Sequence, residues 1–436
     1  MHSPAEQTSI RAWLPLMAAL GAFLAIDPAR PLFLWLGGLH LFLALRALAF
    51  SAVLVVGTRS ALRFKWLPRT VPVPEAGADP LLTLRGFACL MVLVGHGTLV
   101  VFLPSNFDDL VRAPSLYRLV TPSPWVGVWV FFVLSGYLMG KGFYGGRYAI
   151  DRAGILRFYR NRLLRIAPIY WSAVLIVALI QARDVFEPAN LPGLVSSLLF
   201  FQSISLPGVV IGALWSVQTE MGFYLAAPVL FVALCYLAER FEPRKIFLAL
   251  AAAGLLYRVV ITQFDGAWAV SVYSPTLSNL DLFCGGMLSN WFLQNRGAWQ
   301  WDRRLVVVGC AVLFFGGAFV HSAAMADHLR RNLINFGPLV TLLTTSAIIV
   351  WLERTKLHGR LVMATQWFGI LTYAVYVVHE PIFLTLKRML PHDLSAAQTI
   401  AFTAAAIAVS IIVATCAYLL IERPFDEVKR MRPRAV

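Results

Sequence analysis

Two ionisable side chains in one apolar segment have a spacing suited to a chemical site. Arg85 and His96 are 11 positions apart in residues 84–97, so an α-helix places both on one face, about 16 Å apart along its axis. An imidazole titrates near neutral pH, and a carboxylate beside it orients it and stabilises its protonated form. Glu220, in a second apolar segment, is the candidate carboxylate. The pair suggests general-base chemistry, with an interhelical hydrogen bond as the structural alternative for His96.

Other polar residues are expected at the same depth as His96. Tyr373, Tyr376 and His379 belong to the apolar segment 365–386, and Asp281 to another. Ionisable residues in hydrocarbon are costly and are candidate functional residues by default. His379 is either part of the site or a helix-packing residue, and Asp281 can pair with Arg258 structurally or line a pocket.

A basic cluster at residues 157–168 precedes another apolar segment. If the cluster is helical, Arg162 and Arg165 are i, i+3 neighbours. Arginine forks suit phosphate oxygens. The cluster therefore either grips a phosphorylated cofactor or is a topogenic charge run that contacts lipid phosphates.

Residues 131–140 carry no charged side chain. Ser135, Gly136 and Gly140 favour close packing between helices. Ser135 is not expected to be a nucleophile, because no Gly-x-Ser-x-Gly elbow surrounds it.

The composition excludes an ordinary soluble domain. Hydrophobic residues make up 59% of the 436 residues, charged residues only 14%, and the mean hydropathy is +0.72. Apolar runs of about 17–25 residues predict an all-α polytopic membrane protein. The net charge of +15 comes from loops between apolar runs, so no nucleic-acid partner is expected. The five cysteines form no Cys-x-x-Cys pair, and no metal is expected.

The apolar runs predict a ten-helix core preceded by a two-helix hairpin. We expect the hairpin at 1–67, retained in place of a cleaved signal peptide, a cytoplasmic linker at 68–80, the core at 81–425 and a basic tail at 426–436. The ten core spans are expected at 81–103, 124–140, 166–182, 213–238, 246–262, 276–294, 305–320, 335–352, 365–386 and 396–421.

Residues 193–206 are apolar but short, and counting them as a span would invert every later loop. With this segment re-entrant or interfacial, the loops on one side hold 25 Lys and Arg and those on the other side hold 7. The positive-inside rule then predicts that both termini are cytoplasmic.

The chain resembles the acyltransferase-3 family of membrane O-acyltransferases over roughly residues 80–430. Six motifs stand in the family's order. They are Arg85-Gly86 with His96, Phe131-Phe132-Val133-Leu134-Ser135-Gly136-Tyr137, Arg162-x-x-Arg165 before Pro168-x-Tyr170-Trp171, Leu214-Trp215-Ser216-Val217-x-x-Glu220 with Phe223-Tyr224, Tyr373-Ala374-Val375-Tyr376-Val377-Val378-His379-x-Pro381, and Glu422-Arg423-Pro424-Phe425.

The resemblance implies transfer of an acyl group, most often acetyl, from acetyl-CoA or another acyl-CoA to a hydroxyl of a cell-envelope or exported glycan or glycolipid. The expected membrane is the bacterial inner membrane, whose lipids are further partners. The implied roles are the catalytic base for His96 and its functional partner for Glu220. Arg85, Arg162 and Arg165 are expected to bind or position acyl-CoA. The expected substrate pocket comprises Trp215, Tyr373, Tyr376, His379 and Asp281.

Two readings without acyl transfer remain open on the residues alone. A transporter or flippase for a lipid-linked sugar predicts paired broken helices in related halves, and only 193–206 looks broken. A scaffold without chemistry leaves the placement of Arg85, His96 and Glu220 unexplained. No carboxy-terminal hydrolase-like domain follows the last span, so we expect a single transfer step.

Overall fold

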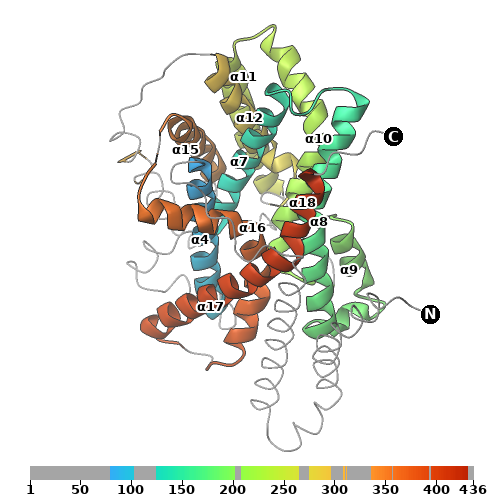
Figure 1. Cartoon of the computed structure of the whole chain (residues 1–436), viewed down its shortest axis with the longest axis vertical. Helices are drawn as coiled ribbons and strands as arrows, with labels where there is room; N and C mark the ends of the chain where they lie inside the picture. The colour runs from blue at the N-terminus through green and yellow to red at the C-terminus, as the bar shows by residue number, and fades with distance from the viewer. Residues whose placement is uncertain are drawn as a thin grey trace, which may run out of the picture. The chain divides into compact units, whose positions relative to one another are not determined.

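The structure is a computed structural model of the chain (Figure 1), and it describes residues 79–102, 124–201, 208–264, 274–295, 308, 309, 311, 335–355, 357–391 and 394–430. The hairpin predicted at 1–67, almost all of the span predicted at 305–320 and the last six residues of the tail lie outside these. The chain divides into two compact units, one of Val73–Ile411 and one of Met1–Pro72 with Ile412–Val436. All contacts described below lie within the first unit.

The described residues form an all-α polytopic membrane fold. Eight of their helical segments are long and apolar enough to cross a membrane. Nine of the ten predicted core spans fall on helices of this part of the chain. These helices are α4 (Pro80–Phe102), α7 (Pro124–Tyr144), α8 (Arg152–Ile180), α10 (Trp215–Ala238), α11 (Pro243–Phe264), α12 (Leu280–Asn295), α15 (Phe336–Glu353), α16 (Arg360–Lys387) and α17 (Ala396–Ala417).

The short segment predicted not to span is helical only over α9 (Leu191–Leu198), which has 8 residues. A helix of that length extends about 12 Å, well short of the hydrocarbon thickness. Its last turn is held by α8, because the Tyr170 hydroxyl donates to the Ser197 carbonyl at 2.9 Å and the Trp171 indole to the Leu198 carbonyl at 2.9 Å. The described helix is thus too short to cross a membrane, and the predicted re-entrant or interfacial placement of 193–206, whose last five residues lie outside the described residues, stays a prediction.

Helix α8 joins the basic cluster to the span that follows it. The Asp151 carboxylate caps its first turn by accepting from the Gly154 amide at 2.6 Å, as an N-cap side chain does. Its 29 residues extend about 43 Å, longer than the bilayer core. Arg162 and Arg165 therefore lie on one continuous helix with the predicted span. The sequence analysis needed this helix for the two arginines to be i, i+3 neighbours.

Glycines bring helix backbones into direct contact at the centre of the fold. Helix α7 packs against α4, α12 and α15, and α16 packs against α4 (Figure 1). A Cβ added at Gly136 would overlap the Phe283 carbonyl, and one added at Gly286 would overlap the Val133 carbonyl. The predicted close packing at Gly136 is confirmed. At the α4–α16 contact, a Cβ on Gly86 would come within 2.8 Å of the Thr365 carbonyl.

Candidate active site

The close contact of α4 with α16 brings two histidines together. His96 Nδ1 lies 3.1 Å from His379 Nε2, and the two ring centres are 4.9 Å apart. His379 is fully buried, and its Nδ1 lies 2.6 Å from the backbone carbonyl of Tyr376. Both residues were predicted at one depth from separate segments, and the structure joins them directly.

The backbone carbonyl fixes the tautomers of the neutral histidine pair. A carbonyl oxygen only accepts, so His379 Nδ1 carries the proton and donates to Tyr376. In the neutral ring Nε2 of His379 is then an acceptor, and His96 Nδ1 must donate to it. This assignment leaves the lone pair of His96 on Nε2, where a general base needs it.

Glu220 makes its own polar cluster on α10. Its Oε1 accepts a hydrogen bond from the Tyr224 hydroxyl at 2.5 Å and another from the Ser135 hydroxyl of α7. The partner of His96 in the described structure is therefore His379 and not Glu220. The sequence prediction paired the histidine with a carboxylate expected at the same depth, but Glu220 accepts from the hydroxyls of Ser135 and Tyr224 instead. A shared catalytic role for His96 and Glu220 stays a prediction.

Arginines from two helices lie beside the Glu220 cluster. Arg85 of α4 interacts electrostatically with Arg165, Tyr224 and Glu220. The guanidinium of Arg162 lies 5.5 Å from the centre of the Tyr224 ring. The Nε atoms of both Arg85 and Arg162 are buried, and in the described structure neither has a hydrogen-bond partner. A buried guanidinium donor that is left unpaired is costly, and an anionic ligand would satisfy it.

Tyr148 lies in the turn between α7 and α8, and its pKa shows that the electrostatic potential at this end of α8 is positive. Burial raises the pKa of its phenol. The charges of Arg162 and Arg147, with hydrogen bonds from Asn161 and Arg162, outweigh burial and bring the pKa below its ordinary value. The lowered pKa reflects surroundings that favour negative charge. The same potential would attract phosphate groups.

The remaining predicted pocket residues have defined contacts. The Tyr376 hydroxyl lies 2.5 Å from the Ser216 hydroxyl and donates to the Ala213 carbonyl at 2.9 Å. The Tyr373 hydroxyl donates to the Ile166 carbonyl at 2.7 Å. The buried Trp215 ring packs edge-on against Phe132 at 6.3 Å. These contacts tie α16 to the start of α10 and to α8 beside the histidine pair.

Asp281 forms a fully buried ion pair with Arg258. Its two oxygens accept from Nη1 and Nη2 of Arg258 at 3.0 and 2.8 Å, and Nη1 also donates to the Ser278 carbonyl at 2.7 Å. The suggested pairing of Arg258 with Asp281 is thus confirmed. Each charge neutralises the other, and the pair joins α11 to α12. This agrees with the structural role that the sequence analysis offered for Asp281.

Sequence reasoning missed three residues that the structure brings to the site. Glu380 accepts a hydrogen bond from the Ala213 amide at 2.5 Å and so holds the start of α10 against α16. It is a carboxylate in an apolar helix, the signal that singled out Glu220. Tyr224 stands one turn after Glu220, where an i, i+4 contact is expected. Ser135 was assigned to packing, and nothing in its own segment indicated that Glu220 would reach it.

Two comparisons with known proteins match acyltransferases. Residues 81–419 match the sequence profile of the acyltransferase domain that defines the acyltransferase-3 family. Acyltransferase MdmB of Streptomyces mycarofaciens is 25% identical over 390 residues, which cover 82% of this chain and 92% of that protein. No solved structure matches the chain.

Proposed function

The chain belongs to the acyltransferase-3 family, and from this premise we propose that it transfers an acyl group, acetyl in the first instance, from cytosolic acyl-CoA to a hydroxyl of a cell-envelope or exported glycan or glycolipid. Membership of the family indicates that the reaction is an acyl transfer. The observation that carries the proposal is the hydrogen-bonded His96–His379 pair, which leaves His96 with an unprotonated Nε2 inside an apolar helix bundle. A scaffold without chemistry would leave the pairing of two ionisable side chains in apolar helices unexplained.

In this mechanism His96 Nε2 removes the proton from the acceptor hydroxyl as its oxygen attacks the thioester carbonyl. The C–S bond then breaks, and the proton on His96 passes to the departing thiolate. His379 accepts from His96 Nδ1 throughout and stabilises the imidazolium that forms. A direct displacement is favoured over an acyl-enzyme because the Ser135 hydroxyl hydrogen-bonds Glu220 and not a histidine.

The arginines would hold the donor. The unpaired Nε atoms of Arg85 and Arg162 fit the phosphates of a coenzyme A thioester, and the pKa of Tyr148 supports a positive potential at that end of α8. Arg165 interacts electrostatically with Arg85, so a bound anion would also relieve their repulsion. Glu220, beside these arginines, would limit how deeply the anionic part of the donor enters.

The proposed orientation brings donor and acceptor to opposite sides of the membrane. The loops that hold 25 of the Lys and Arg residues, against 7 in the others, would face the cytoplasm with both termini. We place the chain in a bacterial inner membrane on this basis. Acyl-CoA is cytosolic, which agrees with Arg162 and Arg165 on the cytoplasmic end of α8.

The function is tested by measuring release of coenzyme A. The full chain, purified in detergent, is incubated with acetyl-CoA and with envelope glycans from a strain that lacks the gene, and free thiol is followed with time. We expect release that depends on the acceptor and a matching gain of acetyl mass on the glycan. Transport of a lipid-linked sugar without any thiol release would contradict the proposal and favour a flippase.

The pairing of the histidines predicts different outcomes for two substitutions of His379. His379→Phe removes the acceptor for His96 Nδ1, and we expect kcat to fall about 100-fold because the imidazole loses its orientation. His379→Gln keeps an oxygen near the place of Nε2 and should recover most of that loss. Steady-state kinetics with acetyl-CoA checks both variants, with the KM for the donor unchanged. Equal losses in the two variants would show that His379 contributes only packing.

A further inference from the structure

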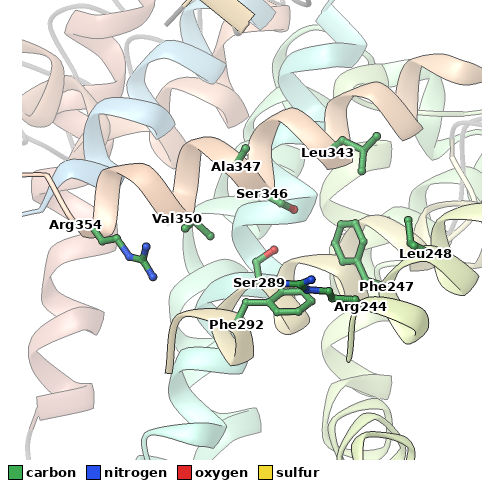
Figure 2. A pocket seen from close by; sticks show the side chains of 10 residues that line it. All are labelled: Arg244, Phe247, Leu248, Ser289, Phe292, Leu343, Ser346, Ala347, Val350 and Arg354. Atoms are coloured by element: carbon green, nitrogen blue, oxygen red, sulfur yellow. The ribbon is translucent and has the colours of Figure 1, made fainter. Parts of the chain in front are cut away.

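A pocket separate from the histidine site opens between α11, α12 and α15. Its volume is about 410 Å³, within the range of small-molecule sites in proteins. Apart from two arginines and two serines, its walls are apolar. Figure 2 shows the lining side chains, which are Arg244, Phe247, Leu248, Ser289, Phe292, Leu343, Ser346, Ala347, Val350 and Arg354.

The apolar part of the pocket lies on the flank of the bundle. Leu248 of α11 is 61% exposed and Leu343 of α15 is 44% exposed, whereas Phe247 and Phe292 stand deeper, as half-buried rings. Exposed leucines on a membrane-spanning helix face hydrocarbon. A hydrocarbon chain can therefore enter sideways from the bilayer and lie against the two phenylalanines.

The charged part of the pocket lies at one end of the helices. Arg244 is the second residue of α11 and Arg354 directly follows α15, and both side chains are exposed. They belong to the predicted loops 239–245 and 353–360, which the charge distribution assigns to the cytoplasm. Two guanidinium groups at the membrane surface beside an apolar cleft are complementary to a phosphate joined to an acyl chain.

A buried hydroxyl between these two parts has no partner. The Ser346 side chain is 8% exposed, and its Oγ makes no hydrogen bond in the described structure. Figure 2 shows it pointing toward Ser289, whose own hydroxyl donates to the Gly285 carbonyl at 2.8 Å. An unpaired buried hydroxyl is unfavourable, and an ester oxygen of a bound ligand would accept its proton.

We propose that this pocket binds one anionic phospholipid from the cytoplasmic leaflet. The lipid phosphate lies between Arg244 and Arg354, an ester oxygen accepts from Ser346, and an acyl chain lies along Phe247 and Leu343. None of the lining residues belongs to the histidine pair or to the Glu220 cluster, so the site is additional to the proposed acyl transfer and does not depend on it. A lipid held there would join α11 to α15.

The test is native mass spectrometry of the full chain in detergent with added phosphatidylglycerol. We expect the wild-type chain to retain one lipid and the double variant Arg244→Gln/Arg354→Gln to bind it at least about tenfold more weakly, because each cation contributes to binding an anionic headgroup. Arg240→Gln is the matched control. Arg240 lies in the same loop, but its guanidinium stacks on Tyr236 at 3.5 Å, so lipid retention should not change.

A second variant tests the apolar part without removing charge. Ala347→Phe fills the pocket from α15, and retention should fall although both arginines remain. Melting temperatures show whether each variant is folded. The proposal is overturned if the double variant and Ala347→Phe retain the lipid as the wild type does. It is also overturned if inorganic phosphate or coenzyme A displaces the lipid at equal concentration, which would indicate a simple anion site or a donor site.

Discussion

His96→Ala is expected to lower kcat for acyl transfer about 1,000-fold and to leave the KM for acetyl-CoA nearly unchanged. A general base contributes 10²- to 10⁴-fold in typical enzymes. In this protein His96 is the histidine whose Nε2 lone pair is left available by the pairing with His379. The donor would be held by the arginines, so its binding does not depend on the imidazole.

The measurement is thiol release by the full chain in detergent, with melting temperature as the check on folding. His358→Ala, in an exposed segment that precedes α16, is the matched control and should keep full activity. Added imidazole should restore part of the rate to His96→Ala by occupying the space of the missing ring. A folded His96→Ala protein with wild-type activity would exclude the mechanism.

Asp281→Ala is expected to destabilise the protein by about 3–5 kcal/mol, since it leaves the buried Arg258 without its charge partner. The side chains of the pair are 0% and 2% exposed, with a shortest separation of 2.8 Å. Replacing both partners, as Arg258→Met with Asp281→Leu, should recover most of the loss because no buried charge remains. Thermal unfolding in detergent compares the variants.

The chain contains a matched ion pair for this experiment. Lys141 and Glu353 also lie 2.8 Å apart, but their side chains are 52% and 23% exposed. Exposed pairs contribute about 1 kcal/mol or less, so Lys141→Ala should barely change the melting temperature. If Asp281→Ala were equally mild, the Arg258–Asp281 pair would have to be accessible to water in the membrane.

Hydropathy located the membrane helices well because long apolar runs have few alternatives to a spanning helix. It could not predict which faces meet. The contact of His96 with His379 depends on the close approach of α4 and α16, where a Cβ on Gly86 would come within 2.8 Å of the Thr365 carbonyl. The sequence predicted only that His96, His379 and Glu220 lie at a similar depth in the membrane. The helix packing determines that His96 bonds His379, whereas Glu220 bonds Ser135 and Tyr224.

The polar partners of Glu220 show the same limit. Its contact with Tyr224 is local, one helical turn away, and a sequence can indicate it. Its contact with Ser135 joins residues 85 positions apart, and no pattern within either helix predicts it. Glu380 was missed for a different reason, because it occupies the unspecified position of the motif His379-x-Pro381.

The glycine contacts between α7 and α12 have a consequence for motion during turnover. Shear between packed helices is a small sliding motion, and at Gly136 and Gly286 the atoms facing the glycine are backbone. A shift along the axis would bring each carbonyl against a neighbouring Cα, so we expect the two helices to move as one block. Ser135 and Asp281, one on each helix, then keep a constant separation while any rearrangement that admits the acceptor takes place in other helices.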